Sequence, residues 1–183
     1  MRSAKPKKPL DREGLMAYSA RVLSARAQTI AELREKLRRR AAEQGDVDEV
    51  LARLKQMGYL NDERFAEGFA SWRKDHEGLG KTRVLRDLMA RRVAPPVAKK
   101  AAEAAFQGSD EIAMMERFLE RKYRGKDLNS LLGEEKHLAS AYRKLRLAGF
   151  SSGNAIKVLK RHAAEADKLE EMAEGIEEDG GER

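Results

Sequence analysis

Residues 29–37 read TIAELREKL, and this short stretch shows the pattern that decides the fold class. Thr29 and Glu32 form a capping box, in which the threonine hydroxyl accepts a free backbone N–H and the glutamate side chain reaches back. Ile30, Leu33 and Leu37 follow at helical spacing, so one face is apolar and the remainder is charged. The stretch therefore predicts a short amphipathic helix with a narrow buried stripe.

The same order of helix start, apolar stripe and stop signal recurs on both sides of this stretch. Residues 124–133 are expected to form a loop with some local helix. Small polar residues that can cap a helix precede four stripes: Asp46, Asn61, Ser109, and Ser151 or Ser152. Helices are expected near residues 14–26, 29–37, 46–58, 61–77, 84–89, 95–106, 109–119, 138–149 and 151–162.

These nine expected helices fall into three groups of three, which indicates an internal repeat. The second and third groups match at a constant offset, with Leu88 opposite Leu145 and Arg92 opposite Gly149. Stacked units of this size share burial across their junctions, as solenoids do. The sequence thus predicts an all-α protein with five segments: a basic N-terminal tail over 1–13, three-helix repeats over 14–62, 63–108 and 109–163, and an acidic tail over 164–183.

Charge is distributed unevenly along the 183 residues, whose formal net charge is +7. Residues 164–183 contain nine acidic and two basic residues, which leaves 36 basic and 22 acidic residues, or +14, on residues 1–163. A basic body of this kind attracts a polyanion, although a solvated basic helix surface is the alternative explanation. One hypothesis is that the acidic tail folds back over the basic body and weakens non-specific binding; a plain solubility tail is its alternative.

The residue types needed for catalysis are scattered. The three histidines, His76, His137 and His162, lie far apart in sequence and belong to no metal-binding motif. Cysteine is absent, which excludes thiolate metal sites and fits a reducing cytoplasm, and no apolar run is long enough for a membrane span. We therefore expect no catalytic residue, no metal and no cofactor, and an enzyme is the least favoured class.

An aromatic stripe follows Asn61, with Phe65, Phe69 and Trp72 at i, i+4 and i+7. This spacing is typical of a core face. A platform on which nucleic-acid bases stack is the alternative. The core assignment applies less clearly to Trp72 than to the two phenylalanines, because the basic residues Arg73 and Lys74 follow it directly.

Several segments, taken in order, resemble RecX, the bacterial recombination regulator. Residues 29–37 resemble the second helix of its first repeat, and residues 58–66, GYLNDERFA, resemble its junction between repeats one and two. The loop through Gly78 and Gly80 with the following Arg83, Val84 and Leu88 resembles the start of the second helix of repeat two. Residues 146–151, RLAGFS, with Ile156, Val158 and Leu159 resemble the close of repeat three.

The resemblance covers roughly residues 15–163 and departs from the family at two places. Arg92 stands where the family usually has a glycine, and the linker before Asp46 is longer than usual. The resemblance implies an elongated, curved protein that binds RecA, lodges in the groove of the RecA–DNA filament, and depresses ATP hydrolysis and strand exchange. The implied partners are RecA, single-stranded DNA and, as a second form, double-stranded DNA, with the chain acting as a monomer. The alternative is a general nucleic-acid-binding helical protein that acts without RecA.

Basic residues recur on corresponding helices of the three repeats, and together they predict a continuous positive track. For each of them a solvated-surface role is the alternative to a contact. The candidate RecA- or DNA-contacting residues are Arg34, Lys36, Arg38, Trp72, Arg73, Lys74, Lys81, Arg83, Arg86, Arg121, Lys122, Arg124, Lys126, Arg143, Lys144 and Arg146.

Overall fold

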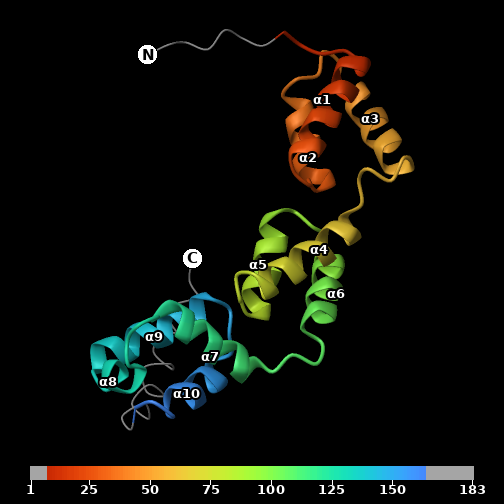
Figure 1. Ribbon diagram of the computed structural model, residues 1–183. Coiled ribbons are helices and arrows are strands. Elements are labelled where there is room, and N and C mark those ends of the chain that lie inside the picture. The colour runs from red at the N-terminus through yellow and green to blue at the C-terminus, as the bar shows by residue number, and fades with distance from the viewer. Residues whose placement is uncertain (1–7, 164–183) are drawn as a thin grey trace, which may run out of the picture. The chain divides into compact units, whose positions relative to one another are not determined.

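The computed structural model describes residues 8–163, and this part of the chain is all-helical, with ten α-helices and no β-strand (Figure 1). The predicted all-α class is confirmed. Residues 1–7 and the acidic segment 164–183, with the hypothesis that concerns it, lie outside the described residues. Within the described range, no helix combines the length and apolarity that a membrane span requires. The helices are α1 (Arg12–Ala25), α2 (Ile30–Arg38), α3 (Gly45–Gln56), α4 (Asp62–Asp75), α5 (Lys81–Ala90), α6 (Pro95–Phe106), α7 (Glu111–Lys122), α8 (Leu128–Leu132), α9 (Glu135–Leu147) and α10 (Ser152–Leu159).

The described residues form two compact units. The first comprises residues 8–69 and Asp87–Ala101, and the second comprises Ala70–Arg86 and residues 102–163. The chain therefore leaves the first unit within α4, re-enters it within α5 and leaves it again within α6.

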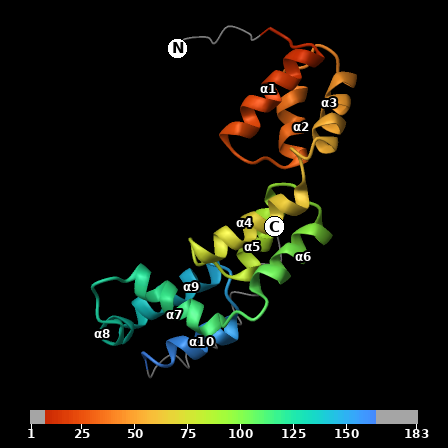
Figure 2. The ribbon, with the colours of Figure 1, turned by 45° about the vertical axis from the view of Figure 1, so that its right-hand side comes forward.

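The core of the first unit lies where α1, α2 and α3 pack against one another (Figures 1 and 2). The stripe predicted on residues 29–37 faces this core, because Leu33 and Leu37 are completely buried. Burial of a leucine side chain contributes about 1.5–3 kcal/mol, so these short helices depend on one another for stability. The other fully enclosed members of this core are Leu15, Val47, Val50, Leu51, Leu54 and Leu60.

The core of the second unit is built mainly from α7, α9 and α10, and α8 packs against α9. The rings of Phe118 and Phe150 meet edge to face, with their centroids 5.8 Å apart. Helix α8 is the local helix expected within residues 124–133, and with it the described residues contain ten helices, one more than the nine predicted. Asp127 caps α8 by accepting the backbone N–H groups of Asn129 and Ser130, and Leu132 anchors it in the core.

Two of the predicted helix starts are confirmed in atomic detail. The Thr29 hydroxyl accepts the Glu32 backbone N–H at 3.1 Å, and the Glu32 carboxylate accepts the Thr29 N–H at 3.1 Å, which completes the capping box. The Asn61 side chain accepts the Arg64 backbone N–H at 2.9 Å at the start of α4. Local sequence was sufficient at these positions because cap and capped group are three residues apart.

Two other predicted caps are wrong. Helix α3 begins before Asp46, which lies in its first turn and forms an ion pair with Arg12 at 3.4 Å. Helix α7 is capped by Asp110 rather than Ser109, because the Asp110 carboxylate accepts two backbone N–H groups at 2.9 and 3.2 Å. At α10, Ser151 is the N-cap residue but its hydroxyl makes no capping bond.

The two positions that the repeat placed opposite each other, Arg92 and Gly149, share an unusual backbone conformation. Gly149 has φ +91°, and Arg92 has φ +60°, which makes it the one non-glycine residue with positive φ in the described range. This region strains any residue with a Cβ. Arg92, which stands where the family usually has a glycine, therefore still adopts the positive φ of a glycine turn.

Candidate partner-binding surface

In the second unit, residues 80–83 at the start of α5 meet residues 147–149 at the end of α9. We call this contact, together with the adjoining turn of each helix (residues 80–86 and 143–149), the α5–α9 junction. The Gly80 N–H donates to the Ala148 carbonyl at 2.8 Å, and the Thr82 N–H donates to the Gly149 carbonyl at 3.3 Å. A helix start has unpaired N–H groups and a helix end has unpaired carbonyls, so the two ends satisfy each other.

The two glycines of the α5–α9 junction permit this close approach. A Cβ on Gly80 would lie 2.3 Å from the Gly149 carbonyl oxygen, and a Cβ on Gly149 would lie 2.2 Å from the Arg83 backbone nitrogen. Both obstacles are backbone atoms, which cannot move aside as the end of a flexible side chain can. Sequence reasoning explained Gly80 only as part of a turn and missed this role, because its contact lies about 70 residues further along the chain.

Exposed basic side chains gather on the two helices that meet at this junction. Lys81 and Arg86 on α5 and Arg143 on α9 are exposed, and Leu147 on α9 is 63% exposed. Arg83 is half-buried and donates to the Leu147 carbonyl at 3.3 Å, so it helps to hold the two helices together. The junction therefore exposes cations and one large apolar side chain to solvent.

Other predicted candidates of the second unit stabilise the fold. Arg73 pairs with Glu77, and Arg121 donates to the carbonyl groups of His76 and Glu77. Lys74 donates to the Ala105 carbonyl at 2.7 Å.

The remaining basic candidates of this unit fall into two groups, those that bond within the fold and those that are exposed. Lys144 donates to the Tyr123 hydroxyl at 3.1 Å, and Arg146 donates to the Phe150 carbonyl at 2.8 Å. Lys122, Arg124 and Lys126 are exposed around the end of α7 and stay candidates for partner contacts.

The three candidates on α2 belong to the first unit. Arg34 forms an ion pair with Asp48 at 3.2 Å, and Lys36 donates to the Gln28 side chain at 2.6 Å. Arg38 is exposed. The continuous positive track stays a prediction.

The aromatic stripe of α4 lies beside the positions that are fully buried. Ala66 and Ala70 have no exposed surface, whereas Phe65 and Phe69 are half-buried and stack on each other with ring centroids 5.7 Å apart. The predicted core positions, Phe65 and Phe69, are therefore each one residue before the positions that are fully buried, Ala66 and Ala70. Trp72 is 49% exposed and stacks on His76, so it stays a candidate for partner contacts.

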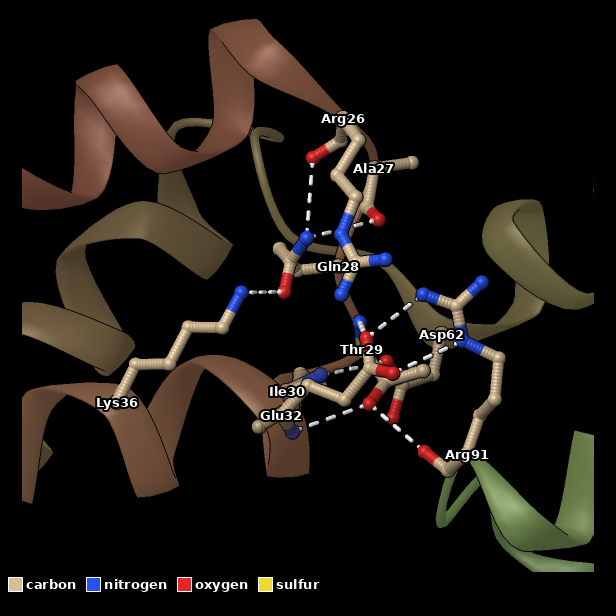
Figure 3. A network of polar contacts seen from close by, with 9 residues as sticks. All are labelled: Arg26, Ala27, Gln28, Thr29, Ile30, Glu32, Lys36, Asp62 and Arg91. Atoms are coloured by element: carbon tan, nitrogen blue, oxygen red, sulfur yellow. Dashed lines mark hydrogen bonds and ion pairs between the residues drawn. The ribbon is translucent and has the colours of Figure 1, made fainter.

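A polar network in the first unit holds the start of α2 (Figure 3). The Thr29 hydroxyl donates to the Arg91 carbonyl at 2.9 Å, and Asp62 accepts the Ile30 backbone N–H at 2.9 Å. The Arg91 guanidinium donates twice to Glu32, at 2.9 Å each. Arg91 lies far from Glu32 in the sequence, so no local pattern could predict this pair.

Glu111 plays a similar structural part in the second unit. Its carboxylate accepts the Ser151 N–H at 2.9 Å and hydrogen bonds from the Ser151 hydroxyl and the Asn154 amide at 2.6 Å each. Burial raises the pKa of Glu111, but these bonds and the charge of Arg146 lower it by more, so the pKa lies below its ordinary value. A carboxylate from α7 thus holds the N-cap residue of α10, whose hydroxyl donates to Glu111 and does not cap the helix as predicted.

The described residues contain no group of three histidine, aspartate or glutamate side chains placed to hold a metal ion.

Two family models match the chain in order along its sequence. Residues 16–54 match the first three-helix domain of RecX, and residues 61–101 match its second three-helix domain. The regulatory protein RecX of Amycolatopsis mediterranei is 32% identical over 144 residues, which cover 79% of this chain and 80% of that protein. The chain belongs to the RecX family. The resemblance noted in the sequence is thereby confirmed.

Further relatives and a solved structure agree with this RecX assignment. The regulatory protein RecX of Deinococcus radiodurans is 39% identical over 93 residues, but the match spans only 44% of that protein's length. The crystal structure of RecX from Lactobacillus salivarius aligns with a TM-score of 0.62 and 16% identity, covering 82% of this chain and 95% of that one. At this identity the structural match shows a shared fold, which is the array of three-helix domains.

Proposed function

We propose that this RecX-family chain binds RecA and the RecA–DNA filament, and that it lowers the filament's ATP hydrolysis and strand exchange. In that role it modulates homologous recombination and DNA repair without chemistry of its own. Family membership supports this function, since the relatives carry the name regulatory protein RecX. The exposed cations at the α5–α9 junction supply a surface that suits a partner rich in phosphate and carboxylate groups.

The observation that carries the proposal is the composition of the α5–α9 junction. Lys81, Arg86 and Arg143 are exposed beside Leu147, and neighbouring side chains such as Arg83 fix the helices that bear them. Cations at the rim steer association, and a desolvated apolar side chain adds affinity on contact. We therefore assign this junction to filament binding.

A titration of RecA ATPase activity on single-stranded DNA tests the function. The wild-type chain is expected to suppress ATP hydrolysis at amounts below one chain per RecA monomer. An unchanged rate at excess chain would refute the proposal. Tight, salt-sensitive DNA binding combined with an unchanged ATPase rate would instead favour the general nucleic-acid-binding protein.

A matched pair of variants tests the assigned surface. Lys81→Gln, Arg86→Gln and Arg143→Gln combined remove three charges from the junction and are expected to weaken ATPase suppression at least tenfold. The control combines Lys55→Gln, Lys99→Gln and Lys100→Gln, which removes three exposed charges elsewhere. Equal weakening by both variants would show that only net charge matters and would remove the junction from the proposal.

A further inference from the structure

The α5–α9 junction is a basic surface with no acidic residue of its own. Residues 80–86 and 143–149 contain six basic residues and no aspartate or glutamate. Arg143 and Leu147 lie four residues apart on α9, so they share one face of that helix. The Arg83 guanidinium donates to the Leu147 carbonyl and so holds the start of α5 beside the end of α9. The junction therefore combines cations from two helices with one exposed apolar side chain.

The exposed cations of the junction have no carboxylate partner among the described residues. Lys81, Arg86 and Arg143 form no ion pair there, whereas Arg161 of the same unit pairs with Glu116. Several cations on one surface attract a carboxylate brought to it more strongly than one cation does. The ligand that fits this surface is therefore acidic and carries an apolar side chain that can cover the exposed leucine.

The chain itself contains a segment of this composition. Residues 164–183 include nine acidic residues and two basic ones. Leu169, Met172 and Ile176 are the large apolar residues of the segment, and each is next to a glutamate in the sequence. An apolar side chain flanked by carboxylates is the chemical counterpart of Leu147 on a basic surface.

The segment is long enough to reach the junction within the second unit. The described part of the chain ends at Ala163, directly after α10, and α10 packs against α9 and α7. Helix α10 has eight residues, so it is about 12 Å long. An extended chain spans up to about 3.3 Å per residue, or about 66 Å for the segment 164–183. Part of the segment is therefore sufficient to return past α10 to Gly149.

The other exposed large apolar side chain among the described residues of this unit suits such a ligand less well. Trp72 is 49% exposed, but its ring stacks on His76. The cations that follow it, Arg73 and Lys74, are bonded within the fold. Only the junction joins exposed cations that lack a described partner to an exposed apolar side chain.

We infer that residues 164–183 bind the α5–α9 junction of the same chain and compete there with an external partner. Carboxylates of the segment pair with the exposed cations, and an apolar side chain of the segment covers Leu147. Attachment to the same chain gives the segment an effective concentration on the order of millimolar, so even weak contacts suffice. The contact itself needs no recombinase, whereas its regulatory consequence rests on the proposed function.

Paramagnetic relaxation in the full chain tests the contact directly. The chain contains no cysteine, so Ala173→Cys provides one attachment point for a nitroxide label without changing the charge of the segment. Amide signals of residues 81–86 and 143–147 are expected to broaden, independently of protein concentration. The broadening should disappear in 1 M salt, where the Debye length is about 3 Å. Equal broadening at residues 122–126, which carry exposed cations in the same unit, would overturn the site, and so would unbroadened signals at the junction.

Matched variants of the labelled chain separate the junction from net charge. The junction variant combines Lys81→Gln, Arg86→Gln and Arg143→Gln, and the control combines Lys122→Gln, Arg124→Gln and Lys126→Gln in the same unit. Each exposed ion pair contributes a factor of up to about five, so the junction variant is expected to weaken the contact about tenfold and to restore the broadened signals. The control should keep the broadening. Equal recovery in both variants would overturn the inference.

The apolar part of the contact has its own test. Leu169→Ser, Met172→Ser and Ile176→Ser combined leave every charge of the segment in place and are expected to reduce the broadening at residues 143–147. Unchanged broadening would show that Leu147 is not covered by the segment. Circular dichroism of each variant verifies that the helices are retained.

The regulatory consequence is measured in the RecA ATPase titration at low salt. Glu170→Gln, Glu171→Gln and Glu174→Gln combined are expected to lower the amount of full chain needed for half suppression about threefold. In a chain that also carries the junction variant, the same change should have no effect. An equal gain in both backgrounds would overturn the competition and leave a plain solubility segment. Absence of suppression by the wild-type chain would refute the proposed function, while the relaxation experiment would still decide the contact.

Discussion

Arg91 and Glu32 form a bidentate ion pair, in which the guanidinium Nε and Nη2 each lie 2.9 Å from a carboxylate oxygen. The planar fork of arginine matches the two oxygens of a carboxylate, which makes such pairs strong and directional. The same guanidinium lies over the rings of Phe65 and Phe69, 4.6 and 5.3 Å from their centroids. The pair thereby ties the start of α2 to the residue that follows α5 within the first unit.

Loss of the Glu32 charge is expected to destabilise the first unit. Glu32→Gln should lower the free energy of unfolding by about 1–3 kcal/mol, because hydrogen bonds to charged, partly buried groups contribute this much. Urea unfolding followed by circular dichroism measures the loss. Glu35→Gln is the matched control on the same helix, since Glu35 pairs with Arg39 and Arg92 on the exposed surface. The control should lose less than about 1 kcal/mol, and equal losses would contradict the assignment.

The contribution of Glu32 should depend on pH in a defined direction. Burial raises its pKa, but hydrogen bonds from Arg91 and the Thr29 N–H, with the charges of Arg91 and Arg26, lower it below the ordinary 4.5. Because the folded state has the lower pKa, the ionised carboxylate stabilises it fully above pH 4.5 and less as the pH falls through the folded pKa. The stability difference between wild type and Glu32→Gln should therefore be constant near neutrality and shrink below pH 4.5. A difference that stays the same at low pH would refute this expectation.

Substitution of Gly80 is expected to open the α5–α9 junction. Gly80→Ala places a Cβ 2.3 Å from the Gly149 carbonyl oxygen, which only backbone movement can relieve. We expect a loss of about 2–4 kcal/mol in the free energy of unfolding. Gly68→Ala within α4 is the control, because a Cβ there meets no atom within 4 Å. Alanine favours helix over glycine by about 1 kcal/mol, so thermal unfolding should show stabilisation at position 68 and destabilisation at position 80.

The positive φ of Arg92 makes a prediction that separates backbone strain from side-chain contacts. Arg92→Asn and Arg92→Val both remove the exposed ion pair with Glu35. Asparagine tolerates the left-handed region, whereas a β-branched residue is strained there. The valine variant should therefore be less stable than the asparagine variant by about 1–2 kcal/mol, as measured by thermal unfolding. Equal stabilities would mean that the turn relaxes to negative φ.

Sequence reasoning succeeded where the interacting groups lie within one or two helical turns. The capping box of Thr29 and Glu32, the buried stripe of Leu33 and Leu37, and the family resemblance all depend on local order. It failed at Asp46 because α3 begins one residue earlier and has no side-chain cap, and at Ser109 because the adjacent Asp110 is an equally suitable cap and makes the bonds. At Ser151 the hydroxyl donates to Glu111, 40 residues earlier, and so does not cap α10.

The sequence by itself determined that this chain is an all-α, RecX-like array with a basic body, because helix periodicity, caps and charge are properties of short segments. Only the tertiary structure decided which cations are available to a partner. Lys74 and Arg121 are held by carbonyl groups of the fold, whereas Lys81 and Arg143 are exposed. A charged side chain carries the same charge in either setting. Its partner, and hence its role, is set by residues brought near it from elsewhere in the chain.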